Sequence, residues 1–289
     1  MERTDPYEPT GRVALVTGAS RGVGAATALA LAAAGVRVAC AARSTASSPK
    51  SVPGTLDETV AAISAAGGDA LAIPTDLTRA DDIEAMVTRT VEHFGRLDIV
   101  VNNAAVTFIG DVDIDLKRHA LIMAINLEAP LLTVRAALPH LRAAGRGRIV
   151  NVSSQAALRP VPGLMSYGIS KIGLERMTID LARQLHRDRI AVNCFRIDIP
   201  VATEGTLANM GDVDLTDWEP AAVAAEGICW MIRQPDDYSG RRESMWNLRR
   251  REAIMASRAQ REYTDPPPLE LLDGLHDLDT ENVFDRPAD

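Results

Sequence analysis

The 289-residue sequence contains only three cysteines, Cys40, Cys194 and Cys229. They are odd in number, lie far apart in apolar stretches and lack the close spacing of metal-ligand motifs. We therefore predict that all three are reduced core residues and that the chain binds no metal ion.

Targeting and membrane-spanning signals are also missing from the sequence. The first twelve residues, MERTDPYEPTGR, are polar and contain no apolar run of the kind found in secretory signals. No stretch approaches the roughly 18 apolar residues that cross a bilayer. The sequence thus predicts a cytoplasmic protein that does not bind a membrane.

The net charge of −8 is concentrated at the C-terminus. Eight acidic residues and one arginine lie between 264 and 289, so this segment contributes −7. An acidic balance argues against nucleic acid as a partner. Because the segment also contains DPPP and little periodicity, we expect an N-terminal arm at 1–10, one domain at 11–262 and an acidic tail at 263–289.

Apolar runs alternate with alanine-rich segments along the body of the chain. The runs predict six strands, each apolar on both faces, at 12–18, 36–43, 68–76, 97–105, 147–154 and 190–197. Helices are predicted between them, at 24–35, 56–67, 80–95, 115–144 and 166–188. This alternation predicts an α/β fold, a Rossmann-type doubly wound parallel sheet with helices on both faces. Ligands of such sheets bind at the carboxyl ends of the strands.

The first predicted strand ends in TGASRGVG, with glycines at 18, 22 and 24. Glycines let a backbone approach a pyrophosphate, and the N-terminus of the following helix presents free N–H groups and a positive dipole end. The strand–glycine–helix context favours nucleotide binding over a purely structural tight turn.

Tyr167 and Lys171 stand four residues apart in YGISK, in a chain with only four tyrosines and three lysines. Residues at i and i+4 share one helix face, so both side chains are predicted to point the same way. Surface helices carry such pairs by spacing alone, which is the alternative to a catalytic pair.

Six motifs taken together resemble the short-chain dehydrogenase/reductase family, in its NADP-preferring type. They are TGASRGVG at 17–24, TDL at 75–77, NNAA at 102–105, Asn126 in AINLEAP, Ser154 in VNVSS, and YGISK at 167–171. The resemblance covers about residues 10–235. Tyr167 follows Ser154 by 13 residues, the usual interval in the family, which selects Ser154 over Ser153 as the catalytic serine.

The resemblance implies a catalytic set of Asn126, Ser154, Tyr167 and Lys171. Tyr167 passes a proton to or from a carbonyl oxygen, and Ser154 hydrogen-bonds the same oxygen. A nearby ammonium and a cationic nicotinamide are expected to lower the tyrosine pKa from about 10. Lys171 also holds the nicotinamide ribose, and Asn126 holds a water that links Lys171 to solvent.

The end of the second strand indicates the cofactor. NAD-preferring relatives place an acidic residue there, but this chain has Ala42 followed by Arg43, with Arg21 in the glycine turn. Two guanidiniums favour the 2′-phosphate of NADP(H), although Arg43 stacking on adenine or lying in solvent is the alternative. The implied cofactor-binding set is Gly18, Ser20, Arg21, Gly22, Val23, Gly24, Arg43, Asp76, Leu77, Asn103, Ala104, Lys171, Ile199 and Thr203.

Two segments depart from the family. The loop at 44–55 is longer than usual and resembles one in hydroxysteroid-dehydrogenase-like members. Two roles are open for it: Ser44 or Lys50 contacts the 2′-phosphate of the cofactor, or the loop is a plain flexible insertion. Ile197 and Asp198 replace the usual Pro-Gly after the sixth strand. The charge of Asp198 near the cleft therefore needs an explanation, and Ile197 and Ile199 are implied to flank the nicotinamide.

The C-terminal region carries two further expectations. Five arginines, Arg241, Arg242, Arg249, Arg250 and Arg251, are expected to form a solvated helix face, with a binding role as the alternative. The acidic tail, with Leu269, Leu271, Leu272, Leu275 and Leu278, is expected to pack near the mouth of the substrate cleft, with a disordered tail as the alternative. Arg159, Met165 and Trp218 are candidates for the substrate pocket.

The expected function is NADP(H)-dependent interconversion of a carbonyl and a secondary alcohol, acting on CH–OH donors. The alternatives are a nucleotide-binding protein with little turnover, or epimerase or dehydratase chemistry at the same site. The partner is a small-molecule substrate. Segments 115–144 and 166–186 resemble the subunit-pairing helices of the family, which implies a homodimer or homotetramer.

Overall fold

The computed structural model describes residues 5–210 and 213–264, with the side chains of 209 and 210 excluded. Its centre is a parallel sheet of seven strands in the order β3-β2-β1-β4-β5-β6-β9. The strands are β1 (Val13–Thr17), β2 (Arg37–Ala42), β3 (Ala70–Pro74), β4 (Ile99–Asn102), β5 (Gly147–Ser154), β6 (Ile190–Ile197) and β9 (Arg242–Ser244). This confirms the predicted Rossmann-type α/β fold.

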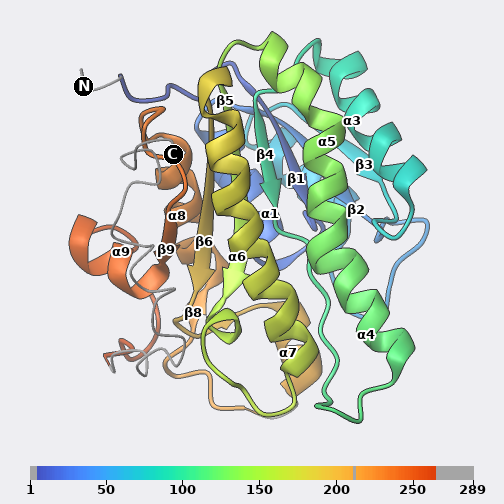
Figure 1. Cartoon of the computed structure of the whole chain (residues 1–289), viewed down its shortest axis with the longest axis vertical. Helices are drawn as coiled ribbons and strands as arrows, with labels where there is room; N and C mark the ends of the chain where they lie inside the picture. Colours follow the sequence, from blue (N-terminus) through green and yellow to red (C-terminus); the bar gives the residue numbers. More distant parts are fainter. Residues whose placement is uncertain (1–4, 211–212, 265–289) are drawn as a thin grey trace, which may run out of the picture.

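Helices cover both faces of the sheet because alternate residues of each strand face opposite cores. Ala14 and Val16 of β1 belong to one core, and Val13 and Leu15 to the other. The helices α1 (Gly22–Ala33), α2 (Leu56–Ala65) and α8 (Ala221–Ile232) cover the first face. The second face is covered by α3 (Ala80–Phe94), α5 (Ala129–Ala143) and α6 (Met165–Leu185), of which α5 and α6 lie in front in Figure 1.

The predicted helix at 115–144 is interrupted. It consists of α4 (Leu116–Met123), a π-helical turn (Ala124–Glu128) and α5. The whole stretch is long and apolar enough, by length and composition, to cross a membrane, so the expectation that no such stretch exists is wrong. Within its most apolar window, 44% of the stretch is buried inside the fold.

The prediction of six strands missed β9, the seventh. Its three residues, Arg-Glu-Ser, contain no apolar run, yet β9 pairs with β6 and all three are buried. The expectation of a solvated arginine face is correspondingly wrong for Arg242 and for Arg249 of α9 (Met245–Glu252), which are both buried. Two short strands, β7 (Val201–Ala202) and β8 (Glu219–Pro220), form a separate parallel pair.

The N-terminal arm is fastened to the amino edge of the sheet. Tyr7 is buried, and its backbone N–H donates to the carbonyl of Arg233 at 2.9 Å. The guanidiniums of Arg12, Arg146 and Arg148 lie 5.3, 5.4 and 4.0 Å from the centroid of its ring. Cation–π contacts are stronger when they are desolvated. Because the Tyr7 ring is buried among these arginines, the N-terminal arm is part of the fold.

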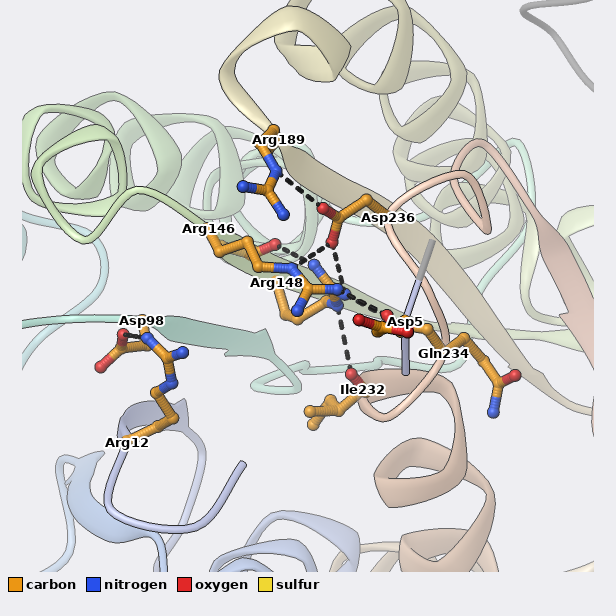
Figure 2. Close-up of polar contacts among 10 residues, drawn as sticks. Asp5, Arg12, Asp98, Arg146, Arg148, Arg189, Ile232, Gln234 and Asp236 are labelled. Atoms are coloured by element: carbon orange, nitrogen blue, oxygen red, sulfur yellow. Dashed lines mark hydrogen bonds and ion pairs between the residues drawn. The ribbon is translucent and has the colours of Figure 1, made fainter. Parts of the chain in front are cut away.

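Asp236 lies at the centre of the ionic cluster beside that arm (Figure 2). Its carboxylate pairs with Arg146 at 2.7 Å, with Arg148 at 2.9 Å and with Arg189 at 3.0 Å. Burial by itself would raise the pKa of Asp236, but the hydrogen bonds from Arg146 and Arg148 outweigh burial and hold the pKa below its ordinary value. The carboxylate therefore stabilises the fold above its ordinary pKa, and this contribution is lost as the pH falls through the lowered value.

Tyr263, near the end of the described residues, packs its ring against that of Trp246 in α9, with 6.0 Å between the ring centroids. The five leucines of the acidic tail lie outside the described residues. The predicted docking of the tail therefore stays a prediction.

We predict that Asp236→Asn lowers the free energy of unfolding at neutral pH by about 3 kcal/mol, because it leaves buried arginine charge uncompensated. The difference from wild type should shrink below about pH 4, where an ordinary aspartate is protonated. Urea denaturation at neutral pH and below about pH 4 measures the free energies of unfolding of the variant and the wild type. The control is Asp180→Asn, which removes only an exposed pair with Arg176. Equal stabilities of Asp236→Asn and wild type at neutral pH would contradict the prediction.

Candidate active site

The candidate site lies at the carboxyl edge of the sheet, where β1, β4 and β5 end. The strand order reverses between β1 and β4, the place where sheets of this topology bind ligands. The turn after β1 leads into α1, the turn after β4 contains Asn103, and β5 ends at Ser154. Helices α4 and α7 (Glu204–Met210) lie at the same end of the molecule in Figure 1.

The glycine turn is packed too closely for side chains. A Cβ on Gly24 would lie 2.3 Å from the carbonyl oxygen of Gly18 and 2.4 Å from Nδ2 of Asn103. Gly18 has a φ of +70°, and a Cβ there would lie 2.8 Å from Cα of Ala104. Asn103 Nδ2 also donates to the carbonyl of Thr17 at 2.9 Å. The NNAA segment after β4 is therefore part of the cradle that the glycines form.

The N-terminus of α1 receives a carboxylate from a distant part of the chain. Arg21 is the N-cap residue but caps no N–H group, and the first turn contains no acidic side chain. The backbone N–H of Gly22 instead donates to Oε2 of Glu204 at 2.9 Å, across 182 residues. Thr203 packs on Gly22 beside this contact. An anion thus already sits at the helix end, so the arrangement fits a pyrophosphate.

The remaining predicted residues of this turn are enclosed by the fold. Ser20, Val23 and Gly24 are buried. A Cβ on Gly54 would lie 2.6 Å from the carbonyl oxygen of Ser20, so the loop at 44–55 packs directly on the turn. The end of the loop at Gly54 is therefore held against the glycine turn, and a flexible insertion in the rest of the loop stays a prediction.

Two cations lie at the end of β2, as predicted. Arg21 is partly buried and donates through Nη2 to the carbonyl of Gly54 at 2.8 Å, and Ser44 donates to the same oxygen at 2.9 Å. Arg43 is exposed and close enough to influence Arg21, whose pKa is lowered by desolvation first and by Arg43 as well. Lys50 instead bonds Ser48 within its own loop.

Asp76 and Leu77 follow β3. Burial by itself would raise the pKa of Asp76, but hydrogen bonds from the backbone and hydroxyl of Thr78, at 3.0 and 2.8 Å, outweigh it and lower that pKa. Leu77 packs against the core on the α3–α5 face. The carboxylate is already engaged in a local turn, and an adenine contact by Asp76 stays a prediction.

Ser154, Tyr167 and Lys171 are brought together by β5 and α6. Ser154 lies close enough to Tyr167 to lower the pKa of the tyrosine hydroxyl. Lys171 is buried, its Nζ lies 5.5 Å from the centroid of the Tyr167 ring, and Nζ donates to the carbonyl of Val152 at 2.8 Å. The predicted serine, tyrosine and lysine therefore form one cluster at the end of β5.

Burial sets the proton affinities of this cluster. Desolvation raises the pKa of Tyr167 to about 12, against the hydrogen bond with Ser154, which lowers it. The expected lowering of the Tyr167 pKa is therefore wrong for the chain by itself. Desolvation lowers the pKa of Lys171 to about 8, opposed by Cys194 and Glu175. Tyr167 is thus a neutral proton donor at neutral pH, and Lys171 is a cation that titrates close to it.

Asn126 lies in the π-helical turn and ties the cluster to the loop after β4. Its Oδ1 accepts from the N–H of Val106 at 2.9 Å, and its Nδ2 donates to the carbonyl of Val106 at 3.0 Å and to Ser170 Oγ at 3.1 Å. Ser170 Oγ in turn donates to the carbonyl of Tyr167 at 2.7 Å. Single π-helical turns are frequent at functional sites. The predicted water-holding role of Asn126 is a separate matter and stays a prediction.

The segment that departs from the family pattern has a structural explanation. Asp198 is buried and accepts from Ser244 Oγ and from the N–H of Trp246, the latter at 2.9 Å. The Asp198 carboxyl group therefore holds the corner between β9 and α9, and its burial raises its pKa. Ile197 and Ile199 pack in the core on the α1–α8 face. Of the proposed pocket residues, Met165 is exposed, while Arg159 and Trp218 are partly buried.

Sequence reasoning missed two carboxylates at this site. Glu204 follows the predicted Thr203 directly, and Glu175 lies one helical turn after Lys171. An acidic residue on the buried face of an amphipathic helix was the available signal for Glu175. Nothing local marks Glu204, because its partner Gly22 is distant in sequence.

The fold and the site together define a doubly wound α/β protein with a glycine cradle beside a serine–tyrosine–lysine cluster. The profile of the short chain dehydrogenase family matches residues 12–207. The chain belongs to this family of oxidoreductases.

Relatives and solved structures agree with that assignment. The chain is 37% identical over 191 residues to a 3-oxoacyl-[acyl-carrier-protein] reductase of Synechocystis, covering 64% of this chain and 72% of the relative. It is 32% identical to hydroxysteroid dehydrogenase-like protein 2 of Danio rerio over 80% of this chain, but spans only 57% of that longer protein. A short chain dehydrogenase from Burkholderia cenocepacia, solved in complex with NADP, is 32% identical, with a TM-score of 0.72 over 82% of this chain and 97% of its own.

We predict that Glu204→Gln tightens binding of a nicotinamide dinucleotide by about two- to fivefold, because it removes an anion that competes for the helix terminus. Fluorescence titration with NADPH measures this. The control is Glu92→Gln, which changes an exposed residue near the C-terminal end of α3, at the opposite edge of the sheet. Weaker binding by Glu204→Gln would show that the carboxylate assists the cofactor and would refute the prediction.

Proposed function

We propose that the protein is an NADP(H)-dependent oxidoreductase that interconverts a carbonyl compound and a secondary alcohol. The observation that carries the proposal is the cluster of Ser154, Tyr167 and Lys171 at the carboxyl edge, beside the glycine cradle. Family membership supports an oxidoreductase, and the NADP-bound relative supports the cofactor. The substrate itself is a small molecule whose carbonyl reaches Tyr167.

In the direction of reduction, bound NADPH would supply the hydride that the carbonyl carbon accepts. Tyr167 donates its hydroxyl proton to the carbonyl oxygen. This proton is available at neutral pH because the pKa of Tyr167 is raised to about 12. Ser154 hydrogen-bonds the same oxygen as negative charge develops on it. The Lys171 ammonium beside the ring stabilises the phenolate that remains.

Lys171 also sets the pH range of the reaction. Its pKa of about 8 means that the ammonium is lost as the pH rises through that value. The phenolate then has no cation beside it, so turnover in the direction of reduction should fall above about pH 8. In the direction of oxidation the same ammonium favours the phenolate that accepts the alcohol proton.

The cofactor-binding set follows from the geometry of the glycine cradle and the end of β2. The N–H groups at the start of α1 would hold the pyrophosphate, and the cradle formed with Asn103 and Ala104 would let the dinucleotide lie against the backbone. Arg21 and Arg43 would meet a 2′-phosphate, with Ala42 where a carboxylate would repel it.

The alternative of a nucleotide-binding protein without turnover rested on the altered segment at 197–198. Asp198 is engaged at the corner between β9 and α9, so this segment no longer favours that alternative. A cytoplasmic location and assembly into a homodimer or homotetramer stay predictions from the sequence.

We predict that Tyr167→Phe lowers kcat by about 10²–10⁴-fold, because the phenyl ring keeps the packing but has no proton to donate. A screen of carbonyl compounds with NADPH, followed at the nicotinamide absorbance, identifies the substrate for this comparison. NADPH affinity and thermal stability should stay close to those of wild type. Retention of most of the rate would refute the role of Tyr167, and a wild type inactive on every carbonyl class would refute the proposed function.

We predict that the double change Ala42→Asp with Arg43→Ser reverses the cofactor preference. Each lost charge-assisted contact costs roughly 1.5–3 kcal/mol, so NADPH affinity should fall about tenfold or more while NADH affinity rises. Parallel titrations with NADPH and NADH measure both. Equal affinity of the wild type for the two cofactors would contradict the assignment of NADP(H).

A further inference from the structure

A buried ionic cluster lies directly behind the proposed catalytic residues. Glu175 of α6 is 0% exposed, and Arg196 of β6 pairs with both of its oxygens, at 2.9 Å through Nε and 2.7 Å through Nη2. Arg242 of β9 donates to the same carboxylate at 3.3 Å. Both arginines are buried. A carboxylate at this depth is stable only with such partners.

The cluster is fastened to the strand that ends in the catalytic serine. Ser153 Oγ donates to Glu175 Oε1 at 2.7 Å, and one helical turn away Lys171 Nζ donates to the carbonyl of Val152 at 2.8 Å. Two successive residues of β5 are thus bound by two successive turns of α6. Because Ser154 follows Ser153 directly, loss of the Glu175 contact would free the end of β5 to move relative to Tyr167.

The same carboxylate supplies negative charge beside Lys171. Burial lowers the pKa of Lys171 to about 8, while Cys194 and Glu175 act against it. Burial also raises the pKa of the Cys194 thiol well above its ordinary value, so Cys194 is neutral and Glu175 carries the opposing charge. The charged and titratable groups facing Lys171 and Cys194 are Tyr167 and Glu175 on α6, Arg196 on β6 and Arg242 on β9.

We propose that Glu175 is a positioning residue of the active site, which binds the end of β5 to α6 and balances the buried positive charge of Arg196, Arg242 and Lys171. This inference rests on the proposed function for its effect on turnover. It also assigns a role to β9, whose Arg242 connects the C-terminal strand to the catalytic helix.

The direct test is the titration of Lys171 by NMR in protein labelled with ¹³C at the lysine ε-carbon. The chain has only three lysines, and the exposed Lys50 and Lys117 serve as internal references. In Glu175→Gln an anion is lost and two buried cations stay. The acid dissociation constant of the Lys171 ammonium should therefore increase about tenfold or more, which moves its titration to lower pH.

The matched control is Glu219→Gln. Glu219 is equally buried and pairs with Arg249 at 2.8 Å, so the same substitution breaks a comparable ion pair away from Lys171. Both variants should lose stability, but only Glu175→Gln should shift the Lys171 titration. A Lys171 titration that is the same in Glu175→Gln, Glu219→Gln and wild type would overturn the inference.

A second variant, expected to shift the Lys171 titration in the opposite direction, tests the inference if Glu175→Gln does not fold. Arg242→Gln removes a cation and keeps the bidentate pair between Glu175 and Arg196, so the Lys171 titration should move to higher pH. A shift to lower pH would overturn the inference.

Turnover separates this inference from the proposed function. In Glu175→Gln the alkaline limb of the kcat profile should move to lower pH and kcat should fall. An unmoved alkaline limb in a folded, active variant overturns the inference alone. A wild type without carbonyl turnover refutes the proposed function, and the NMR titration still decides the role of Glu175.

Discussion

Both faces of a parallel sheet must be buried, and this constraint organises the rest of the molecule. Each strand of the main sheet except the last is followed by a segment that returns over one face, so the carboxyl ends of the strands meet at one edge. Asn103 after β4 thereby reaches the carbonyl of Thr17 at the end of β1, 86 residues away. The same constraint places Ser154 at the end of β5 against α6. The glycine cradle and the proposed catalytic cluster are two consequences of one arrangement.

Arginine allows this protein to bury charge at both edges of the sheet. At the amino edge, Asp236 gathers three guanidiniums and holds the N-terminal arm against the strands. Toward the carboxyl edge, Glu175 gathers two more beside Lys171. The planar guanidinium binds a carboxylate through two nitrogens, so a desolvated pair keeps its hydrogen bonds. The first cluster closes the fold, whereas the second lies where its charge acts on the proposed reaction.

Sequence reasoning succeeded where the signal was local. The glycine turn, the Tyr167–Lys171 spacing and the six apolar strands each depend on residues a few positions apart, and the structure has the elements where they were expected. It failed for β9, because strand pairing with β6 rather than apolar composition buries Arg242. It also could not supply the explanation for Asp198, because its partners Ser244 and Trp246 lie 46 and 48 residues away in the sequence.

The sequence by itself determined the doubly wound fold, because periodicity is a property of short segments, and its resemblance to the short-chain dehydrogenase family implied the residues proposed for catalysis. The tertiary structure alone decided which charges meet. It brought Glu204 to the N–H of Gly22 and surrounded Glu175 with arginines from two different strands. It also decided the proton affinities of Tyr167 and Lys171, since these depend on the water excluded from the end of β5. Burial and long-range pairing arise only when distant segments pack, so no local pattern encodes them.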